Sequence, residues 1–310
     1  MKKTWRIVLP ALLVGSFISF ADTKDKREIN DKAVTEEICP CEMEGMDPEE
    51  AYNRSMANAG VSQQVSKETP KYLNPNIPIE ERIDDLLPRL TLEEKVIQLS
   101  DSWGSKGIAR LKIPAMLKTE GLHGQSYATG STIFPHGINM GSTFDTELIQ
   151  EVGKATAIEA KAANLRVSWS PVLDVARDAR WGRVEETYGE DPYLVGRIGV
   201  AWIKGFQGEH MFACPKHFAG HGQPVGGRDS HDYGLSDRVM RNIHLAPFRD
   251  VIKEANAFGV MAAYGLWNGV PDNGSKELLQ KILREEWGFE GFVVSDCSGP
   301  ENIQRKQSVV

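Results

Sequence analysis

The sequence is poor in the features that mark several large classes of protein. Its 310 residues include only four cysteines, Cys39, Cys41, Cys214 and Cys297. A four-cysteine zinc site needs two close pairs of ligands, and only one close pair is present. Buried or free thiols are therefore favoured, with a cross-link open in an oxidising compartment. We expect no catalytic metal, because no spacing makes His123 or His136 a ligand together with nearby histidines or carboxylates. We also expect no cofactor, since no Walker or G-x-G-x-x-G sequence follows any apolar run.

Dense basic runs and long apolar runs are also lacking. The formal net charge is -7 and lysine and arginine are scattered, which argues against nucleic acid as a partner. The longest apolar stretch, residues 7–20, contains Pro10 and is shorter than the ~20 residues that span a bilayer. A basic MKKTWR precedes it, and small residues allow cleavage after Ala21. Residues 1–21 therefore predict a secretory signal peptide and export to the periplasm or the exterior, with a membrane anchor as the alternative.

The remaining chain divides into a polar segment and a patterned one. Residues 22–70 are acidic and lack hydrophobic periodicity, which predicts a flexible lead-in. Order is expected over residues 71–310. Near its start, Thr91 and Glu94 form the pattern of a capping box before an apolar helical run.

Apolar runs and amphipathic segments alternate along the patterned part. Four short runs, residues 166–175, 211–220, 259–269 and 291–296, alternate with helical patterns over 145–165, 191–208, 236–258 and 275–287. This order predicts parallel βα units with strands that are apolar on both faces. The fold class is therefore α/β.

Polar residues stand at the end of each apolar run. They are Asp174 with Arg177, Lys216 with His217, Tyr264 with Asn268, and Asp296. In a TIM barrel all strand ends converge on one catalytic face. A doubly wound sheet would instead place one ligand beside a glycine-rich loop, which is not present. We expect a TIM-type (β/α)8-like barrel of which about seven strands are present, and thus an incomplete one.

Among these strand-end residues, Asp296 gives the clearest indication of function. An aspartate after a strand can cap the next helix. Here, however, Lys216, His217, Arg180 and Tyr264 also stand at strand ends, and such neighbours favour the ionised form of a carboxylate. An oriented carboxylate of this kind is the nucleophile of a retaining glycosidase.

Four segments give the sequence a family likeness. They are SWSPVLDVARDARWGRVEETYGEDPYLVGRIGVAWIKGFQG, PKHFAGHGQPVGGRD, AAYGLWNGVP and LREEWGFEGFVVSDC. Residues 72–300 resemble the catalytic barrel of glycoside hydrolase family three. The resemblance implies exo-acting β-glucosidases, β-xylosidases or β-N-acetylhexosaminidases that work by double displacement. It also implies a β-linked gluco- or xylo-oligosaccharide, or an aryl glycoside, as the substrate.

The resemblance also assigns roles to single residues. Asp296 falls on the family's nucleophile, and Lys216 and His217 fall on the pair that binds hydroxyls of the terminal sugar. Arg180 falls on an arginine that contacts the same sugar, and Arg183 is its neighbour. The remaining substrate-binding positions are Tyr264 close to the nucleophile, Glu120 as an acceptor for sugar hydroxyls, and Trp267 as a stacking platform beside Tyr264.

Two questions stay open in this comparison. Glu120 and Cys297 lean towards xylosidases, whereas GHGQPVGGRD and GLWNGVP lean towards glucosidases, and we rank β-glucosidase first. The general acid/base is a glutamate beyond the barrel in the glucosidases. In another branch it is a loop histidine, a position that His231 of Asp229-Ser230-His231 imitates.

The resemblance further implies that the family's eighth βα unit and second domain would follow Val310. We expect a piece of a larger enzyme. The alternative is a catalytically incomplete chain that only binds sugar or complements a separate second half.

Overall fold

The computed structural model describes residues 69–99, 104–126 and 129–305. The predicted signal peptide, residues 22–68 of the predicted lead-in, Cys39 and Cys41 lie outside the described residues. Apart from six 3-10 turns of three residues each, the helices in the described ranges are α2 (Ile79–Leu86), α3 (Leu92–Leu99), α4 (Gly137–Gly141), α5 (Thr146–Ala162), α6 (Pro192–Gly208), α7 (Asp237–Val239), η7 (Met240–His244), α8 (Ala246–Ala255), η9 (Glu277–Glu286) and α9 (Gly299–Arg305). The strands are β1 (Gly104–Ser105), β2 (Met116–Thr119), β3 (Val167–Ser168), β4 (Phe212–Ala213), β5 (Gly259–Ala262), β6 (Leu266–Trp267), β7 (Val270–Pro271) and β8 (Phe292–Ser295).

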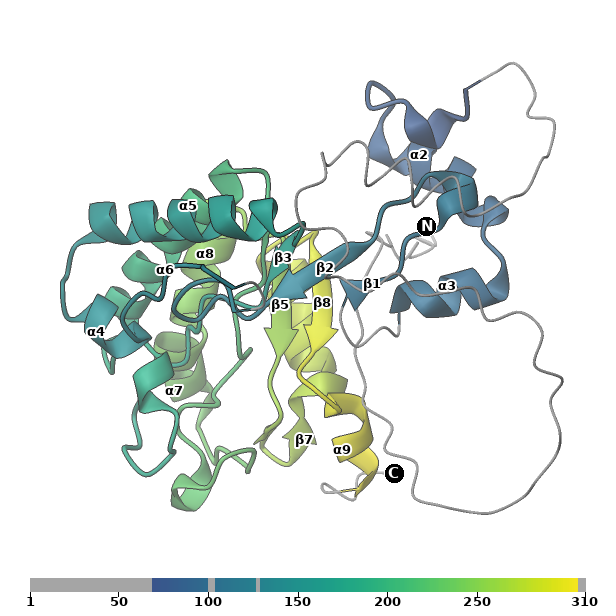
Figure 1. Ribbon diagram of the computed structural model, residues 1–310. Helices are drawn as coiled ribbons and strands as arrows, with labels where there is room; N and C mark the ends of the chain where they lie inside the picture. The colour runs from purple at the N-terminus through teal and green to yellow at the C-terminus, as the bar shows by residue number, and fades with distance from the viewer. Residues whose placement is uncertain (1–68, 100–103, 127–128, 306–310) are drawn as a thin grey trace, which may run out of the picture.

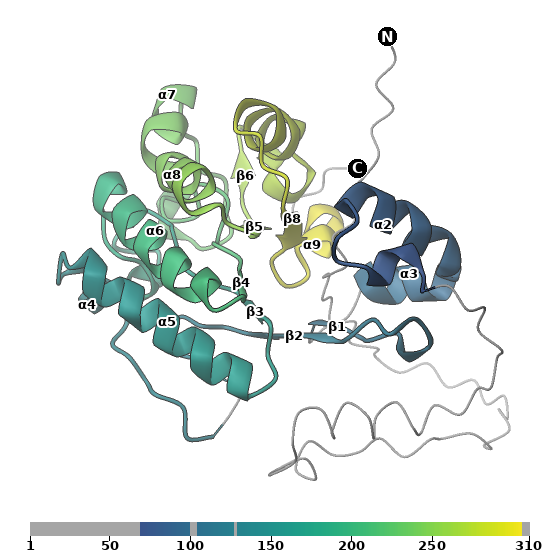
Figure 2. The ribbon, with the colours of Figure 1, turned by 90° about the horizontal axis from the view of Figure 1, so that it is seen from above.

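The parallel strands follow one another across the sheet in chain order. β2 pairs with β3, β3 with β4, and β5 with β8, all in parallel. Single parallel bridges from Lys216 to Val172 and from Phe218 to Ala262 extend the β3–β4 pairing and join it to β5. Helices α5, α6 and α8 lie along the outside of this curved row, as Figure 1 and the view from above in Figure 2 show. The prediction of parallel βα units is confirmed.

A closed barrel is not seen in the described residues, and the expectation of about seven barrel strands is wrong for this part of the chain. Five of the described strands form the parallel row. At one end of the row, β2 also pairs with the antiparallel β1. At the other end, β8 pairs with β5. Part of the apolar sequence after β5 forms the antiparallel hairpin β6–β7 instead. Asn268 and Gly269 allow that hairpin because both adopt positive φ, as a tight two-residue turn requires.

The long outer helices begin and pack as their sequences direct. The Asp145 and Asp191 side chains accept hydrogen bonds from the Leu148 and Leu194 backbone N–H groups and so cap α5 and α6. A Cβ at Gly153 would come within 2.3 Å of the Trp202 carbonyl oxygen, so a glycine lets the two helices approach closely. The expected capping box is confirmed, because the Thr91 and Glu94 side chains each accept from the other's backbone N–H.

The sheet separates two apolar layers. The larger layer lies between the strands and helices α5, α6, α8 and η9. A smaller cluster inside the curve takes two buried residues from β3 and its end and one each from β4, β5 and β8 or their ends: Val167, Trp169, Cys214, Met261 and Val294. This inner cluster packs directly beneath the strand ends, where a functional site can form. Within the described ranges, no helix is both long and apolar enough to cross a bilayer.

Candidate active site

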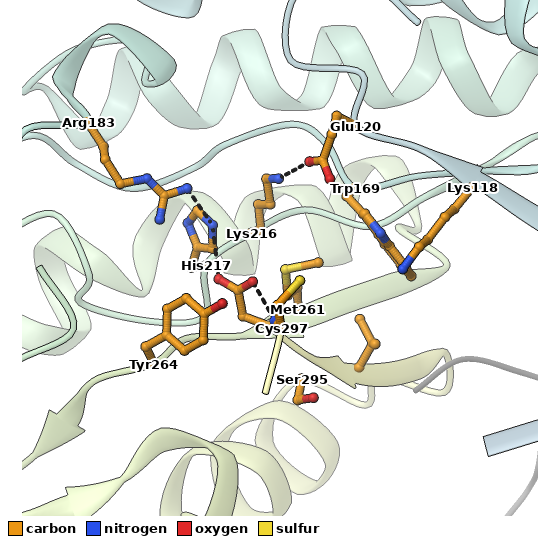
Figure 3. A pocket seen from close by; sticks show the side chains of 12 residues that line it. Lys118, Glu120, Trp169, Arg183, Lys216, His217, Met261, Tyr264, Ser295 and Cys297 are labelled. Carbon is orange, nitrogen blue, oxygen red and sulfur yellow. Dashed lines mark hydrogen bonds and ion pairs between the residues drawn. The ribbon is translucent and has the colours of Figure 1, made fainter. Parts of the chain in front are cut away.

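A pocket of about 220 Å³ opens at the carboxyl ends of the parallel strands. Trp169, Met261 and Val294 of the inner cluster line it. The rest of the lining comes from residues within or after β2, β4, β5 and β8, and from Arg183 on the loop after β3. Figure 3 shows Arg183, His217 and Tyr264 on one side of this space and Glu120, Lys118 and Trp169 on the other. The strand-end rule thus brings together residues that are far apart in the sequence.

Asp296 follows β8 and lines this pocket. Its backbone N–H donates to the Ala262 carbonyl at 3.2 Å, which continues the pairing with β5. Its Oδ1 accepts from the Cys297 N–H at 2.7 Å, and its Oδ2 lies 3.5 Å from His217 Nε2. The carboxylate is thus turned into the pocket rather than onto the first turn of α9.

Tyr264 stands beside that carboxylate at the end of β5. Burial, followed by the negative charge of Asp296, raises the pKa of the Tyr264 hydroxyl. The hydroxyl therefore stays protonated at neutral pH and can donate a hydrogen bond towards Asp296 or a substrate oxygen.

Glu120 and Lys216 form an ion pair that spans the ends of β2 and β4. Lys216 Nζ donates to Glu120 Oε2 at 2.8 Å, and the lysine is almost fully buried. The Ser170 hydroxyl holds the Glu120 backbone carbonyl at 2.6 Å. An ammonium and a carboxylate fixed side by side can donate to and accept from neighbouring hydroxyls of one sugar ring.

His217 is fixed by Asp174, which lies a few residues after β3. Asp174 Oδ2 accepts from the His217 backbone N–H at 3.1 Å and lies 2.7 Å from His217 Nδ1. Burial lowers the pKa of His217 well below its usual value and raises the pKa of Asp174. His217 is therefore neutral at pH 7, with its proton on Nδ1 and a lone pair on Nε2 facing the pocket.

Of the two arginines predicted to bind the sugar, Arg183 lines the pocket and Arg180 does not. Arg183 lines the pocket, and its Nη2 lies 3.1 Å from His217 Nε2. Two hydrogen bonds of 2.7 and 2.8 Å to Glu186 hold the guanidinium in place. Arg180 instead bonds Asp178, has a side chain that is 69% exposed, and is not among the lining residues.

Two other predicted residues lie away from the pocket. Trp267 is buried in the larger apolar layer, where its Nε1–H donates to the Leu235 carbonyl at 2.9 Å. His231 is exposed on its loop and is not part of the lining. Asp229, which the sequence suggested as its partner, lies 3.1 Å from His221 Nε2 instead.

Sequence reasoning missed several residues at the pocket. Trp169 and Lys118 both line it, with Lys118 Nζ 4.9 Å from the centre of the Trp169 ring. Trp169 directly follows β3, so the strand-end rule that found Asp296 could have found it. Glu186 had no such signal, because it acts from a loop through Arg183.

The described residues include two cysteines and several histidines and carboxylates that could in principle bind a metal or form a disulfide. No group of three or more histidine, cysteine or carboxylate side chains that could hold a metal occurs in the described ranges. Cys214 is buried and free, and Cys297 is free and exposed at the edge of the pocket.

Known proteins share this sequence and this architecture. Residues 91–309 match the family described as "Glycosyl hydrolase family 3 N terminal domain". A β-xylosidase from Formosa agariphila is 40% identical over 236 residues, which cover 72% of this chain and 32% of that protein. A β-glucosidase from Rhizobium radiobacter is 38% identical over 225 residues, which cover 70% of this chain and 27% of that protein.

A solved structure gives the same picture. β-Glucosidase 3B from Thermotoga neapolitana, in complex with α-D-glucose, aligns with a TM-score of 0.63 and 32% identity over 69% of this chain and 34% of its own. This chain thus spans about a third of the length of the relatives it matches. The family match covers more than two thirds of the chain, and the chain therefore belongs to the glycosyl hydrolase family 3 N-terminal domain family.

Proposed function

We propose that the pocket is the sugar-binding and nucleophile part of a retaining, exo-acting β-glycosidase site, which hydrolyses terminal non-reducing β-D-glucosyl residues by double displacement. The observation that carries the proposal is the placement of the Asp296 carboxylate. It is held by the Cys297 N–H and faces a pocket of about 220 Å³, the size of a single sugar ring. A pocket of that size favours attack at a chain end.

In the first step an Asp296 oxygen attacks the anomeric carbon while the bond to the leaving oxygen breaks. Tyr264, beside Asp296, donates a hydrogen bond within the site. Lys216 and Glu120 bind sugar hydroxyls as an ammonium–carboxylate pair, and Arg183 supplies a further donor. In the second step water attacks the same carbon while the bond to Asp296 breaks. The proton of the water passes to solvent, Asp296 is freed as a carboxylate, and the sugar is released.

The proton for the leaving group needs a separate source. Glu120 is the other carboxylate of the described lining, and its contact with Lys216 suits it to hydroxyl binding. His231 is exposed outside the lining. The decisive assay therefore uses leaving groups that depart without a proton.

The test is hydrolysis of dinitrophenyl β-D-glucoside and β-D-xyloside by the full 310-residue chain and by Asp296→Ala. We expect measurable turnover that falls by about 10³-fold or more in the variant, as for other nucleophiles. The matched control is Asp250→Ala, which removes a carboxylate on the outer helix α8 that contacts Arg197. Equal rates for the wild type and Asp296→Ala would refute the assignment.

A second candidate is β-xylosidase activity in the same site. Glu120 and Cys297 both line the pocket, and the Formosa agariphila relative is a β-xylosidase. Packing against one CH2OH group discriminates by only ~1–3 kcal/mol. The ratio of kcat/KM for the two dinitrophenyl glycosides decides between the sugars. A folded chain that binds sugar without turnover would favour the non-catalytic alternative.

We also propose that the protein is exported, on the basis of residues 1–21 alone. The basic start, the apolar stretch and the small residues before the cut after Ala21 support this. Amino-terminal sequencing of the mature protein from the periplasm or medium is the test. A mature protein that retains Met1 in the cytoplasm would contradict it.

A further inference from the structure

Arg183 offers five N–H groups, and the described contacts occupy four of them. Nε and Nη2 bind the two oxygens of Glu186, and Nη2 also approaches His217. Nη1 lies 3.1 Å from His221 Nε2. The second N–H of Nη1 is then the one that this guanidinium can present to a substrate, and its direction depends on how His221 holds Nη1.

The contact with His217 has a fixed polarity. A guanidinium can only donate, so His217 Nε2 must accept. That requires the proton of His217 on Nδ1, where Asp174 Oδ2 receives it at 2.7 Å. Asp296 Oδ2 also approaches Nε2, but at 3.5 Å, farther than Arg183 Nη2 at 3.1 Å. Arg183 and Asp174, which contact the two ring nitrogens of His217, therefore favour this tautomer.

The contact with His221 has two competing partners at one atom. His221 Nε2 lies 3.1 Å from Arg183 Nη1, a donor, and 3.1 Å from Asp229 Oδ1, an acceptor. The ring is fully buried, and its Nδ1 has no hydrogen-bond partner among the described atoms. If the proton of His221 is on Nε2, this atom can donate to Asp229. If the proton is on Nδ1, Nε2 can accept from Arg183.

Asp229 is itself held in place. Its Oδ1 accepts from the Trp181 indole N–H at 2.6 Å, and its Oδ2 accepts from the Ser230 hydroxyl at 3.1 Å. The Trp181 ring packs edge-on against His221, with ring centres 5.2 Å apart. The carboxylate is therefore a fixed negative charge behind His221, outside the pocket lining.

We propose that Asp229 and His221 form a positioning pair for Arg183. When the proton of His221 is on Nε2, it is donated to Asp229, and Nη1 of Arg183 is released towards the substrate. When the proton is on Nδ1, Nε2 accepts from Nη1 and anchors it. Asp229 thereby sets how Arg183 meets a sugar hydroxyl and, through Arg183, how firmly His217 keeps its tautomer. The inference rests on the proposed function for its consequence in catalysis, but the contacts it invokes exist without substrate.

The first variant is Asp229→Asn, which removes the charge but leaves an oxygen for Trp181. Asp229→Glu restores the carboxylate and serves as the rescue. Asp250→Asn is the matched control, since it makes the same change in a carboxylate of α8 away from the pocket. Unfolding temperatures identify any variant that fails to fold. If Asp229→Asn does so, Asp229→Ser, which also removes the charge, takes its place in the comparison.

The first readout needs no turnover. The ¹⁵N chemical shifts of the imidazole rings distinguish the two neutral tautomers from each other and from the cation, which heavy-atom positions alone do not. We expect His217 to carry its proton on Nδ1 in the wild type. In Asp229→Asn the His221 signals should shift towards the form that accepts at Nε2, with a smaller shift at His217, whereas Asp250→Asn leaves both unchanged. Unchanged His221 signals in Asp229→Asn would overturn the proposal.

The second readout is a double-mutant cycle with Arg183→Lys. In the wild-type background we expect Asp229→Asn to lower kcat/KM for dinitrophenyl β-D-glucoside by about 10-fold, as outer partners of site residues do. Binding of isofagomine, which is bound in a solved β-glucosidase from Listeria innocua, should weaken similarly. In the Arg183→Lys background the factor should shrink towards one. Full additivity would mean that Asp229 acts elsewhere and would refute the positioning role.

The two failures can be told apart. A wild-type chain that neither hydrolyses the substrate nor binds isofagomine counts against the proposed function, and the ¹⁵N signals still judge the positioning pair. A fully active wild type with an unaffected Asp229→Asn counts against the pair alone.

Discussion

The pocket and the outer face of helices α6 and α8 both carry a network of charged side chains centred on an arginine. On the helices, Arg197 contacts Asp250 at 3.1 Å and Glu254 at 2.6 Å, and the Glu254 side chain is 45% exposed. In the pocket, Arg183 contacts Glu186 and two buried histidines. Water can take the place of a lost partner on the helices, but not beside the histidines.

The difference shows what burial does to a polar network. An exposed ion pair is screened by water and contributes little to stability. A buried donor that loses its partner bears the full cost of desolvation. The same types of side chain should therefore be replaceable on the helices and not replaceable around His217, and four experiments can break or sharpen this contrast.

The largest effect on stability is expected for Asp174→Ala. This change leaves the backbone N–H and Nδ1–H of His217 without an acceptor in a fully buried place. We expect the free energy of unfolding in urea to fall by about 3 kcal/mol, from two orphaned donors at ~1–3 kcal/mol each. A loss below about 1 kcal/mol would show that the region around Asp174 admits water and would break the comparison.

The two neighbouring arginines provide the next test. Arg183→Ala removes a donor to His217 and to the pocket, and we expect kcat/KM for dinitrophenyl β-D-glucoside to fall by ~10- to 100-fold. Arg180→Ala alters only an exposed pair with Asp178, and the rate should stay within about twofold. A larger loss in Arg180→Ala would mean that Arg180 reaches the substrate in the complex.

The third test uses pH and His244, a buried histidine 3.1 Å from the Gln223 side-chain oxygen. Burial lowers the pKa of His244 to about 4. The unfolded chain binds a proton near pH ~6.5 whereas the folded one does not, so stability is present above that pH and is lost as pH falls from ~6.5 to ~4. Each such histidine contributes at most ~1.4 kcal/mol per pH unit. His244→Gln should reduce the slope of unfolding free energy against pH by that amount, and an unchanged slope would contradict the shift.

The smallest effect is expected on the helices. Arg197→Ala should lower the free energy of unfolding by less than about 1 kcal/mol in urea melts, since Asp250 keeps a contact with Arg249. Raising the salt concentration should shrink the difference further. A loss comparable to that of Asp174→Ala would show that exposure does not separate the two networks.

Much of the site was predictable because strand ends carry their chemistry in the local sequence. Asp296, Tyr264, Lys216, His217 and Glu120 all stand within four residues of a described strand. Parallel strands bring such positions to one edge whatever the loops do. The rule needs only the order of apolar runs, which the sequence displays.

Residues on loops and in hairpins escaped the same reasoning. Arg180 and Arg183 are three positions apart, and nothing local says which of them faces His217. Trp267 and Trp169 both lie in apolar runs, yet Trp267 lies in the hairpin β6–β7 and turns into the outer core, whereas Trp169 turns into the pocket. The direction of a side chain after a turn depends on the path of the loop, which distant contacts set.

The sequence by itself determined the alternation of strands and helices, the caps that start α5 and α6, and the side chains offered at the strand ends, because each depends on neighbours a few residues away. Only the tertiary structure decided which arginine enters the pocket, which partner Asp229 takes, and how the sheet curves without closing in the described residues. Those outcomes depend on burial and on contacts between segments up to about a hundred residues apart, such as Lys216 with Glu120, and no local pattern encodes them.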